Sequence, residues 1–115
     1  MLFAYLSLDE VNQDLAQRLV AAVGGTLDVL SFRDAAPNGQ FDAVVYDLDS
    51  LPVDRRHAIV ANLQAGPVSG PVAVHSYNLR GRQARALRGQ GVLVSKRLRP
   101  ALFAVLTQRV TPNFV

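Results

Sequence analysis

Several polar side chains follow predicted strands, at positions where they could handle a phosphoryl group or a metal ion. Asp47 and Ser76 each end an apolar run of strand length, and Lys96 comes just after a third such run. A carboxylate can accept a phosphoryl group as a mixed anhydride, while a hydroxyl and an ammonium group can stabilise its oxygens. Asp49 adds a second carboxylate, so Asp47 and Asp49 together are candidate ligands for a cation. The alternative is that both carboxylates only stabilise the turn after the strand.

The segments that must position these side chains alternate between strand and helix patterns. Apolar runs typical of strands lie at residues 2–8, 26–32, 41–47, 71–76 and 92–95. Apolar residues at helical spacing predict helices within residues 9–23, 53–65, 79–91 and 100–110. Strands that are apolar on both faces and alternate with helices indicate a parallel sheet covered on both sides. We therefore expect an α/β fold with one doubly wound five-stranded parallel sheet, in the order 2-1-3-4-5 and in three α/β/α layers.

Local signals predict where some of these elements begin and end. Ser7 and Glu10 have the spacing of a capping box, which predicts that Ser7 caps the first helix. Gly24 is typical of the end of that helix, and Pro100 suits the first turn of the last helix. The segment 33–40 is rich in loop-forming residues. A turn or a short helix is therefore expected there, where the fold would place a helix between the second and third strands.

The composition limits the kinds of site that the chain can form. Its 115 residues fit a single domain, 1–115, with 110–115 expected to be a frayed tail. There is no cysteine, and two histidines alone cannot form a zinc site. His75 lies inside an apolar strand, so we expect a hydrogen-bonded core histidine, whereas His57 is expected on a solvated helix face. No run approaches the ~18 apolar residues of a membrane span, and no signal peptide is recognisable, so a cytoplasmic location is expected.

The charges divide the chain into two parts. All nine acidic residues precede residue 55, whereas seven of the twelve lysines and arginines lie between Arg80 and Arg99. This asymmetry predicts an acidic or otherwise anionic partner for the late part of the chain. The candidate partner-binding residues are Arg82, Arg85, Arg88, Arg97 and Arg99. A solvated face and a nucleic-acid surface are the alternatives, although the cluster has little aromatic interleaving and no recognised nucleic-acid motif.

In order and spacing, these elements and polar residues resemble the receiver domain of bacterial two-component response regulators, over about residues 2–110. Asp47 stands where the family carries its phospho-accepting aspartate, Ser76 where it has a switch serine or threonine, and Lys96 where it has a lysine. The resemblance implies a flavodoxin-like fold and a signalling module rather than an independent enzyme. It also implies protein partners, such as a histidine kinase or an output domain, and a homodimer through the last two helices and the strand between them. It therefore favours protein partners over nucleic acid.

Three departures from the family pattern indicate a degenerate member, a pseudo-receiver. The family holds Mg²⁺ with a pair of acidic residues after the first strand, where this chain has Ser7 and Leu8, and leucine cannot coordinate a cation. The loop after Asp47 has one residue more before its proline, and Arg97 replaces a family proline, so the peptide bond before it should be trans. We expect phosphorylation to be impaired or absent and no cofactor to be needed. The alternative is a phosphorylatable receiver with an atypical Mg²⁺ site at Asp47 and Asp49.

Overall fold

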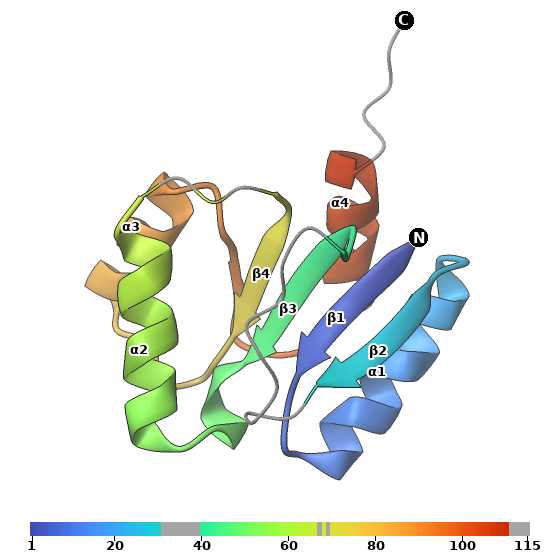
Figure 1. Cartoon of the computed structure of the whole chain (residues 1–115), viewed down its shortest axis with the longest axis horizontal. Coiled ribbons are helices and arrows are strands. Elements are labelled where there is room, and N and C mark those ends of the chain that lie inside the picture. The colour runs from blue at the N-terminus through green and yellow to red at the C-terminus, as the bar shows by residue number, and fades with distance from the viewer. Residues whose placement is uncertain (31–39, 67, 69, 111–115) are drawn as a thin grey trace, which may run out of the picture.

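The computed structural model of the chain contains a five-stranded parallel sheet between two layers of helices (Figure 1). It describes residues 1–30, 40–66, 68 and 70–110. The strands are β1 (Leu2–Leu6), β2 (Thr26–Leu30), β3 (Ala43–Asp47), β4 (Val72–His75) and β5 (Leu93–Ser95). The helices are α1 (Glu10–Ala22), α2 (Val53–Gln64), α3 (Gly81–Gly89) and α4 (Pro100–Val110), with a 3-10 turn, η1 (Leu48–Ser50), directly after β3. The strand order is β2-β1-β3-β4-β5, which confirms the predicted flavodoxin-like topology.

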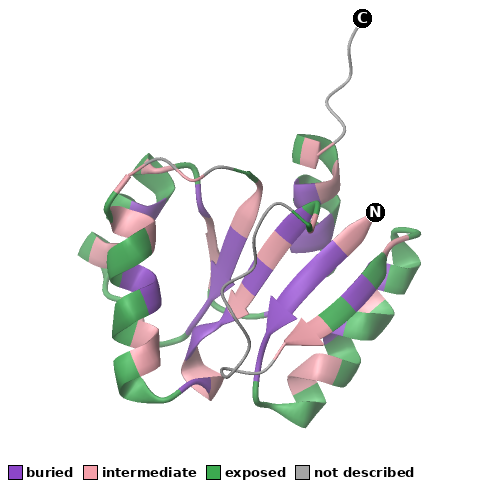
Figure 2. Ribbon diagram, viewed as in Figure 1, coloured by how far each residue is buried: buried purple, intermediate pink, exposed green. Residues whose placement is uncertain are grey.

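The alternation of side chains along the strands creates a hydrophobic core on each face of the sheet. α1 and α4 cover one face, and α2 and α3 cover the other (Figure 1). Successive side chains of a strand point to opposite faces. Phe3 and Tyr5 of β1 therefore belong to the α1/α4 core, whereas Val74 of β4 belongs to the α2/α3 core. Most of β1 is buried (Figure 2), as expected for a central strand covered on both sides.

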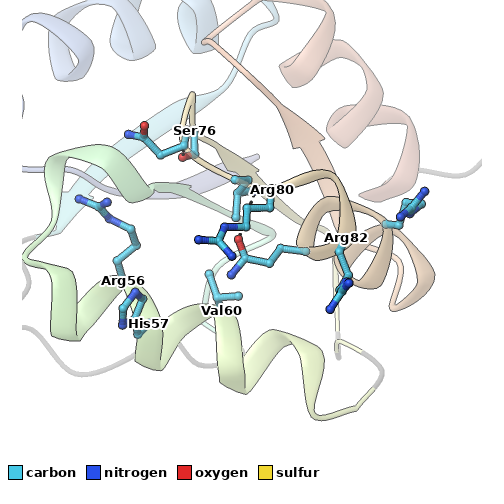
Figure 3. Close-up of a pocket in the computed structure, with 10 residues that line it drawn as sticks. Arg56, His57, Val60, Ser76, Arg80 and Arg82 are labelled. Carbon is cyan, nitrogen blue, oxygen red and sulfur yellow. Dashed lines mark hydrogen bonds between the residues drawn. The ribbon is translucent and has the colours of Figure 1, made fainter.

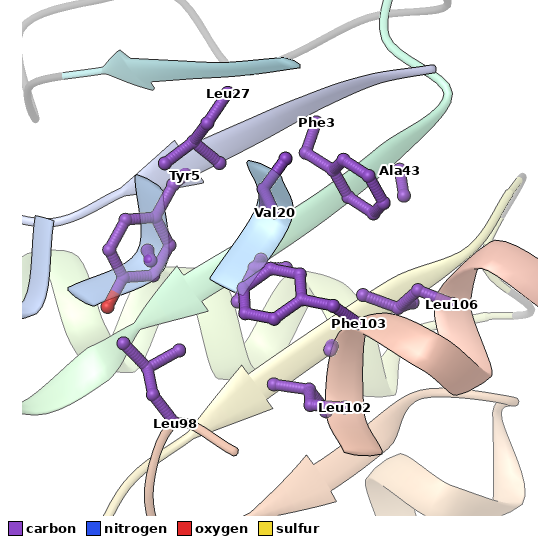
Figure 4. Close-up of a cluster of buried hydrophobic side chains, with 12 residues drawn as sticks. Phe3, Tyr5, Val20, Leu27, Ala43, Leu98, Leu102, Phe103 and Leu106 are labelled. Carbon is purple, nitrogen blue, oxygen red and sulfur yellow. The ribbon is translucent and has the colours of Figure 1, made fainter. Parts of the chain in front are cut away.

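The α1/α4 core contains the largest buried aromatic side chains (Figure 4). Phe3 and Phe103 meet edge to face, with ring centroids 5.7 Å apart and an angle of 83° between the ring planes. The charge distribution of aromatic rings favours this arrangement. Val20 of α1 and Leu106 of α4 pack into the same cluster. Tyr5 also brings a hydroxyl group into this core, and that group needs a hydrogen-bond partner there.

The N-terminal end of α1 differs from the prediction. The N-cap residue is Asp9, whose carboxylate accepts a hydrogen bond from the backbone N–H of Asn12 at 3.0 Å. The helix is therefore capped at Asp9, the first residue of the predicted segment 9–23, whereas the prediction that Ser7 caps it is wrong, because the cap lies two residues later than the capping box requires. The correction matters for the site, since Ser7 is buried and its hydroxyl has another partner.

The two helix-end signals at Gly24 and Pro100 are confirmed, whereas β1, β3 and α3 are about two residues shorter at one or both ends than predicted. Gly24 has a φ of 76° and ends α1, with its N–H donating to the carbonyl of Ala21 at 3.0 Å. Pro100 is the first residue of α4. The turn or short helix predicted at 33–40 falls almost entirely outside the described residues, as does the tail beyond Val110, the last residue of α4. Within the described ranges, no helix is both long enough and apolar enough to cross a membrane.

The α1/α4 core predicts a large difference between two identical leucine truncations on helices. Leu106 is fully buried, whereas Leu15 is 38% exposed. Leu106→Ala should lower the free energy of unfolding by about 2–5 kcal/mol, because it removes buried apolar contacts and leaves a cavity. The control Leu15→Ala should change it by less than about 1 kcal/mol. Urea unfolding measures both changes, and equal losses would contradict the assignment of the core to the inner faces of α1 and α4.

Candidate functional site

The carboxyl ends of the strands bring polar side chains to one edge of the sheet, because all five strands run parallel. β3 and β4 pair so that Asp47 lies beside His75. Asp47 follows Val45 by two positions, and His75 follows Ala73 by two positions. Val45 and Ala73 belong to the α1/α4 core, so the side chains of Asp47 and His75 point to the same face of the sheet. There they meet groups from β1 and α1. We call this set the buried polar cluster; it consists of Tyr5, Ser7, Asn12, Asp47 and His75.

The Asp47 carboxylate is enclosed in this cluster. Asp47 is only 2% exposed. Its Oδ2 atom accepts two hydrogen bonds, one from the Ser7 hydroxyl at 2.9 Å and one from the Asn12 side-chain amide at 3.0 Å. The Ser7 oxygen in turn accepts a hydrogen bond from the backbone N–H of Asp9 at 3.1 Å. Two neutral donors, held by the end of β1 and the first turn of α1, therefore compensate the buried charge.

His75 connects the carboxylate to Tyr5. The His75 Nδ1 atom lies 3.8 Å from Asp47 Oδ1, and its Nε2 atom lies 2.7 Å from the Tyr5 hydroxyl. The two rings are stacked, with centroids 5.8 Å apart. Burial lowers the pKa of His75 although the Asp47 carboxylate opposes this, and burial together with Asp47 raises the pKa of Tyr5. Both groups are therefore neutral at pH 7, and the prediction of a hydrogen-bonded core histidine is confirmed.

The Asp47 carboxylate favours one of the two tautomers of the neutral imidazole. The neutral phenol of Tyr5 donates to Nε2, which leaves the imidazole proton on Nδ1, facing the carboxylate of Asp47. The opposite tautomer would point a lone pair at a negatively charged oxygen. The separation of 3.8 Å between His75 Nδ1 and Asp47 Oδ1 is too long for a hydrogen bond, so this contact is electrostatic.

Asp49 belongs to a different environment from Asp47. It lies in η1, and its carboxylate accepts hydrogen bonds from the Ser76 hydroxyl, the Tyr77 backbone N–H at 2.8 Å and the Asn78 side chain at 3.1 Å. Partial burial opposes the charged form, but these three hydrogen bonds outweigh it and lower the pKa of Asp49. Asp49 therefore ties η1 to the loop between β4 and α3.

The structure places the other two predicted site residues apart from Asp47. Ser76 is 4% exposed and donates its hydroxyl proton to Asp49. Lys96 is exposed and, among the described residues, forms no ion pair with Asp47. Asp47 is paired with His75 instead. The peptide bond between Lys96 and Arg97 is trans, as predicted. The strand edge thus brings Ser76 and Asp49 together, but it pairs neither Ser76 nor Lys96 with Asp47.

The groups around Asp47 do not have the character of a Mg²⁺ site. Mg²⁺ needs several oxygen ligands in near-octahedral geometry, with carboxylates to supply charge. Ser7 and Asn12 instead direct a hydroxyl proton and an amide N–H at the carboxylate, an arrangement that suits an anion rather than a cation. Asp9 is used as the cap of α1. Among the residues described, no three His, Cys, Asp or Glu side chains come together.

The predicted partner-binding arginines do not all lie in one place. Arg82 and Arg85 of α3 line a groove together with Arg56 and His57 of α2 (Figure 3). The remaining three, Arg88, Arg97 and Arg99, are exposed on α3 and in the loop after β5 and do not line the groove. His57 is exposed, as predicted. The sequence reasoning missed Arg56, because it lies far before the basic segment and only the packing of α2 beside α3 brings it there.

The comparisons with known proteins identify the fold. No protein-family model matches the sequence, and no curated protein matches it. The chain is similar to the structure of a response regulator receiver protein from Pseudoalteromonas atlantica (TM-score 0.69, 9% identity, 96% of each chain covered). It is also similar to the non-phosphorylated HemR receiver domain from Leptospira biflexa (TM-score 0.61, 17% identity, 99% of this chain and 96% of the other). A third similar structure is a CheY-like response regulator from Mesorhizobium loti (TM-score 0.56, 20% identity, 95% and 97%). The chain therefore has the fold of a response regulator receiver domain, as the sequence resemblance implied.

The buried polar cluster predicts that mild acid destabilises the protein through His75. Because the pKa of His75 in the folded protein lies below its ordinary value of 6.5, the unfolded chain binds a proton in mild acid that the folded protein does not. The free energy of unfolding should therefore fall as the pH is lowered from about 7.5 to about 5. In His75→Gln, whose side chain cannot titrate, this fall should be smaller. Urea unfolding at a series of pH values measures it.

The matched control is His57→Gln, because His57 is exposed. This variant should keep the pH dependence of the wild-type protein. If His75→Gln also kept it, the assignment of a neutral, buried His75 would be wrong.

Proposed function

We propose that this protein is a pseudo-receiver, a non-enzymatic signalling module that acts through contacts with other proteins and without Mg²⁺-dependent phosphorylation of Asp47. The observation that carries the proposal is the environment of the Asp47 carboxylate. It is 2% exposed, and one of its oxygens accepts hydrogen bonds from Ser7 and Asn12. Phosphoryl transfer needs a carboxylate oxygen in line with the leaving group. A donor could reach Asp47 only if this edge of the sheet opened.

Charge also opposes phosphoryl transfer at Asp47. A phosphoryl donor is an anion, and a bound metal ion would normally offset its repulsion from a carboxylate. Ser7 and Leu8 stand where the resemblance places the acidic pair that binds this metal. The imidazole nearest to Asp47, that of His75, is held neutral by burial, which lowers its pKa. These observations support a structural role for Asp47.

The geometry gives less support to the alternative of an atypical Mg²⁺ site at Asp47 and Asp49. The two carboxylates have separate sets of partners, and Asp49 holds Ser76, Tyr77 and Asn78. If Asp49 turned toward a cation shared with Asp47, these three hydrogen bonds would be lost. That cost favours a pseudo-receiver over a receiver with a rebuilt metal site.

A module of this kind would work by presenting a surface to a partner. The face formed by α3, β5 and α4 carries the exposed Arg88, Arg97 and Arg99, which favours a partner with acidic side chains. We include in the proposal that this partner is a histidine kinase, an output domain or a second copy of the chain, and that the protein works in the cytoplasm. Receiver folds similar to this one come from response regulators, which supports a signalling role.

A phosphodonor assay tests this proposal directly. The protein is incubated with acetyl phosphate and Mg²⁺ and analysed by intact-mass spectrometry, and beryllofluoride with Mg²⁺ is added in a parallel thermal-melting experiment. We expect no added phosphoryl group and no change in melting temperature, because the Asp47 carboxylate is enclosed. Stoichiometric modification that disappears in Asp47→Asn would reject the pseudo-receiver. If the modification also disappeared in Asp49→Asn, the correct interpretation would be an atypical Mg²⁺ site at Asp47 and Asp49.

The proposed structural role of Asp47 has its own test. Asp47→Ala should lower the free energy of unfolding by about 1–3 kcal/mol, because it leaves the buried donors of Ser7 and Asn12 without their acceptor. The exposed carboxylate Asp54 provides the control, and Asp54→Ala should have a much smaller effect. Urea unfolding of both variants at neutral pH measures the difference. Equal stability of Asp47→Ala and the wild-type protein would contradict the structural role.

A further inference from the structure

A polar groove lies between α2 and α3, outside the buried polar cluster (Figure 3). Its volume is about 670 Å³, which is within the range of small-molecule sites. The basic residues that line it are Arg56, His57, Arg80, Arg82 and Arg85. Arg56 and His57 extend from α2, and Arg80 extends from the start of α3 toward the same space. None of the described lining residues is acidic, so the groove concentrates positive charge.

The Asp49 carboxylate offsets part of the charge of Arg56, but the groove arginines form no ion pair among the described residues. The ion pairs within the described part of the chain join Arg18 to Asp14 and His75 to Asp47. The groove arginines take part in neither of them. Four guanidinium groups around one groove repel each other unless an anion lies between them. The arrangement therefore favours occupancy by a ligand with several negative charges.

The start of α3 adds to this imbalance. The N-terminal end of a helix carries a partial positive charge and is normally occupied by acidic or hydroxyl side chains. In α3 the N-cap residue is Arg80, whose backbone N–H donates to the Gln83 side chain at 3.2 Å, and the first turn contains Arg82 and no acidic residue. The sequence thus places positive side chains where the helix dipole is already positive. An anion bound beside this helix end would be stabilised both by the partial positive charge of the helix and by the arginine side chains.

Arg56 on the opposite wall is held in a fixed position. Its Nε atom donates to the carbonyl of Leu48 at 3.0 Å, and its Nη2 atom donates to the carbonyl of Leu51 at 3.2 Å. Its charge also contributes to the lowered pKa of Asp49. These contacts order the side chain before any ligand arrives, and preorganisation lowers the entropic cost of binding.

We propose that this groove binds a compact anion that carries two or more adjacent phosphates, either an inorganic phosphate chain or the phosphate tail of a nucleotide. Guanidinium groups match phosphate oxygens with paired hydrogen bonds, and arginine is the residue best suited to such recognition. The apolar lining residues are Val60 and Leu79, so charge rather than apolar contact provides the recognition. The site is separate from Asp47 and does not depend on whether Asp47 is phosphorylated.

Isothermal titration calorimetry with sodium tripolyphosphate in low-salt buffer tests the proposal, with thermal melting as a second readout. Tripolyphosphate should bind saturably at one site and raise the melting temperature. Arg82→Gln/Arg85→Gln should weaken binding by at least about tenfold, because it removes two charged contacts. Without ligand, this double variant should be at least as stable as the wild-type protein, since it relieves repulsion at the start of α3.

The matched control is Arg97→Gln/Arg99→Gln, which removes the same charge outside the groove and should keep near wild-type affinity. An equal loss in both double variants would show diffuse attraction to a basic surface and overturn the proposal, as would the absence of saturable binding.

ATP distinguishes the two sources of phosphate: tighter binding than tripolyphosphate indicates a nucleotide, and equal binding indicates the phosphate chain alone. Tighter binding of a polyglutamate peptide would overturn the assignment to phosphate.

Discussion

The burial of the Asp47 carboxylate is the constraint on which the carboxyl edge of the sheet depends. A buried charge is costly unless hydrogen-bond donors replace the water that it has lost. Here the donors come from the end of β1 and from the first turn of α1, through Ser7 and Asn12. β4 places His75 at the other carboxylate oxygen, and Tyr5 of β1 satisfies the far side of the imidazole. Asp47, which in sequence resembles a phospho-accepting aspartate, thus connects β3 to three other elements: β1, α1 and β4.

The second carboxylate does a similar task on the neighbouring loop. Asp49 follows Asp47 by two residues, but the turn η1 directs it toward the loop between β4 and α3. Its hydrogen bonds from Ser76 and Asn78 hold that loop in place. Both of these residues also line the polar groove between α2 and α3. Asp49 thus positions two residues that line the groove, while Arg56 on α2 is held by its hydrogen bond to the carbonyl of Leu48.

The chain has the receiver fold, and its charged side chains are unevenly distributed over it. At the carboxyl edge the Asp47 carboxylate is buried and accepts hydrogen bonds, whereas basic side chains are exposed around α3 and after β5. In α3 the apolar residues Ala84 and Leu87 are buried, whereas Arg82, Arg85 and Arg88 are exposed. The apolar and the charged residues thus lie on opposite sides of the same short helix.

The sequence by itself determined the class of fold, the strand order and most element boundaries, because alternating apolar runs and helical spacing are local properties. It also placed Ser7 and Leu8 where an acidic pair would be needed for a metal. The tertiary structure alone decided what these residues contact. Ser7 meets Asp47 across 40 positions and Asn12 meets it across 35, so both contacts depend on strand register and helix rotation. For the same reason the predicted capping box was not found and Arg56 was missed, since local spacing does not show which side chains of neighbouring elements meet.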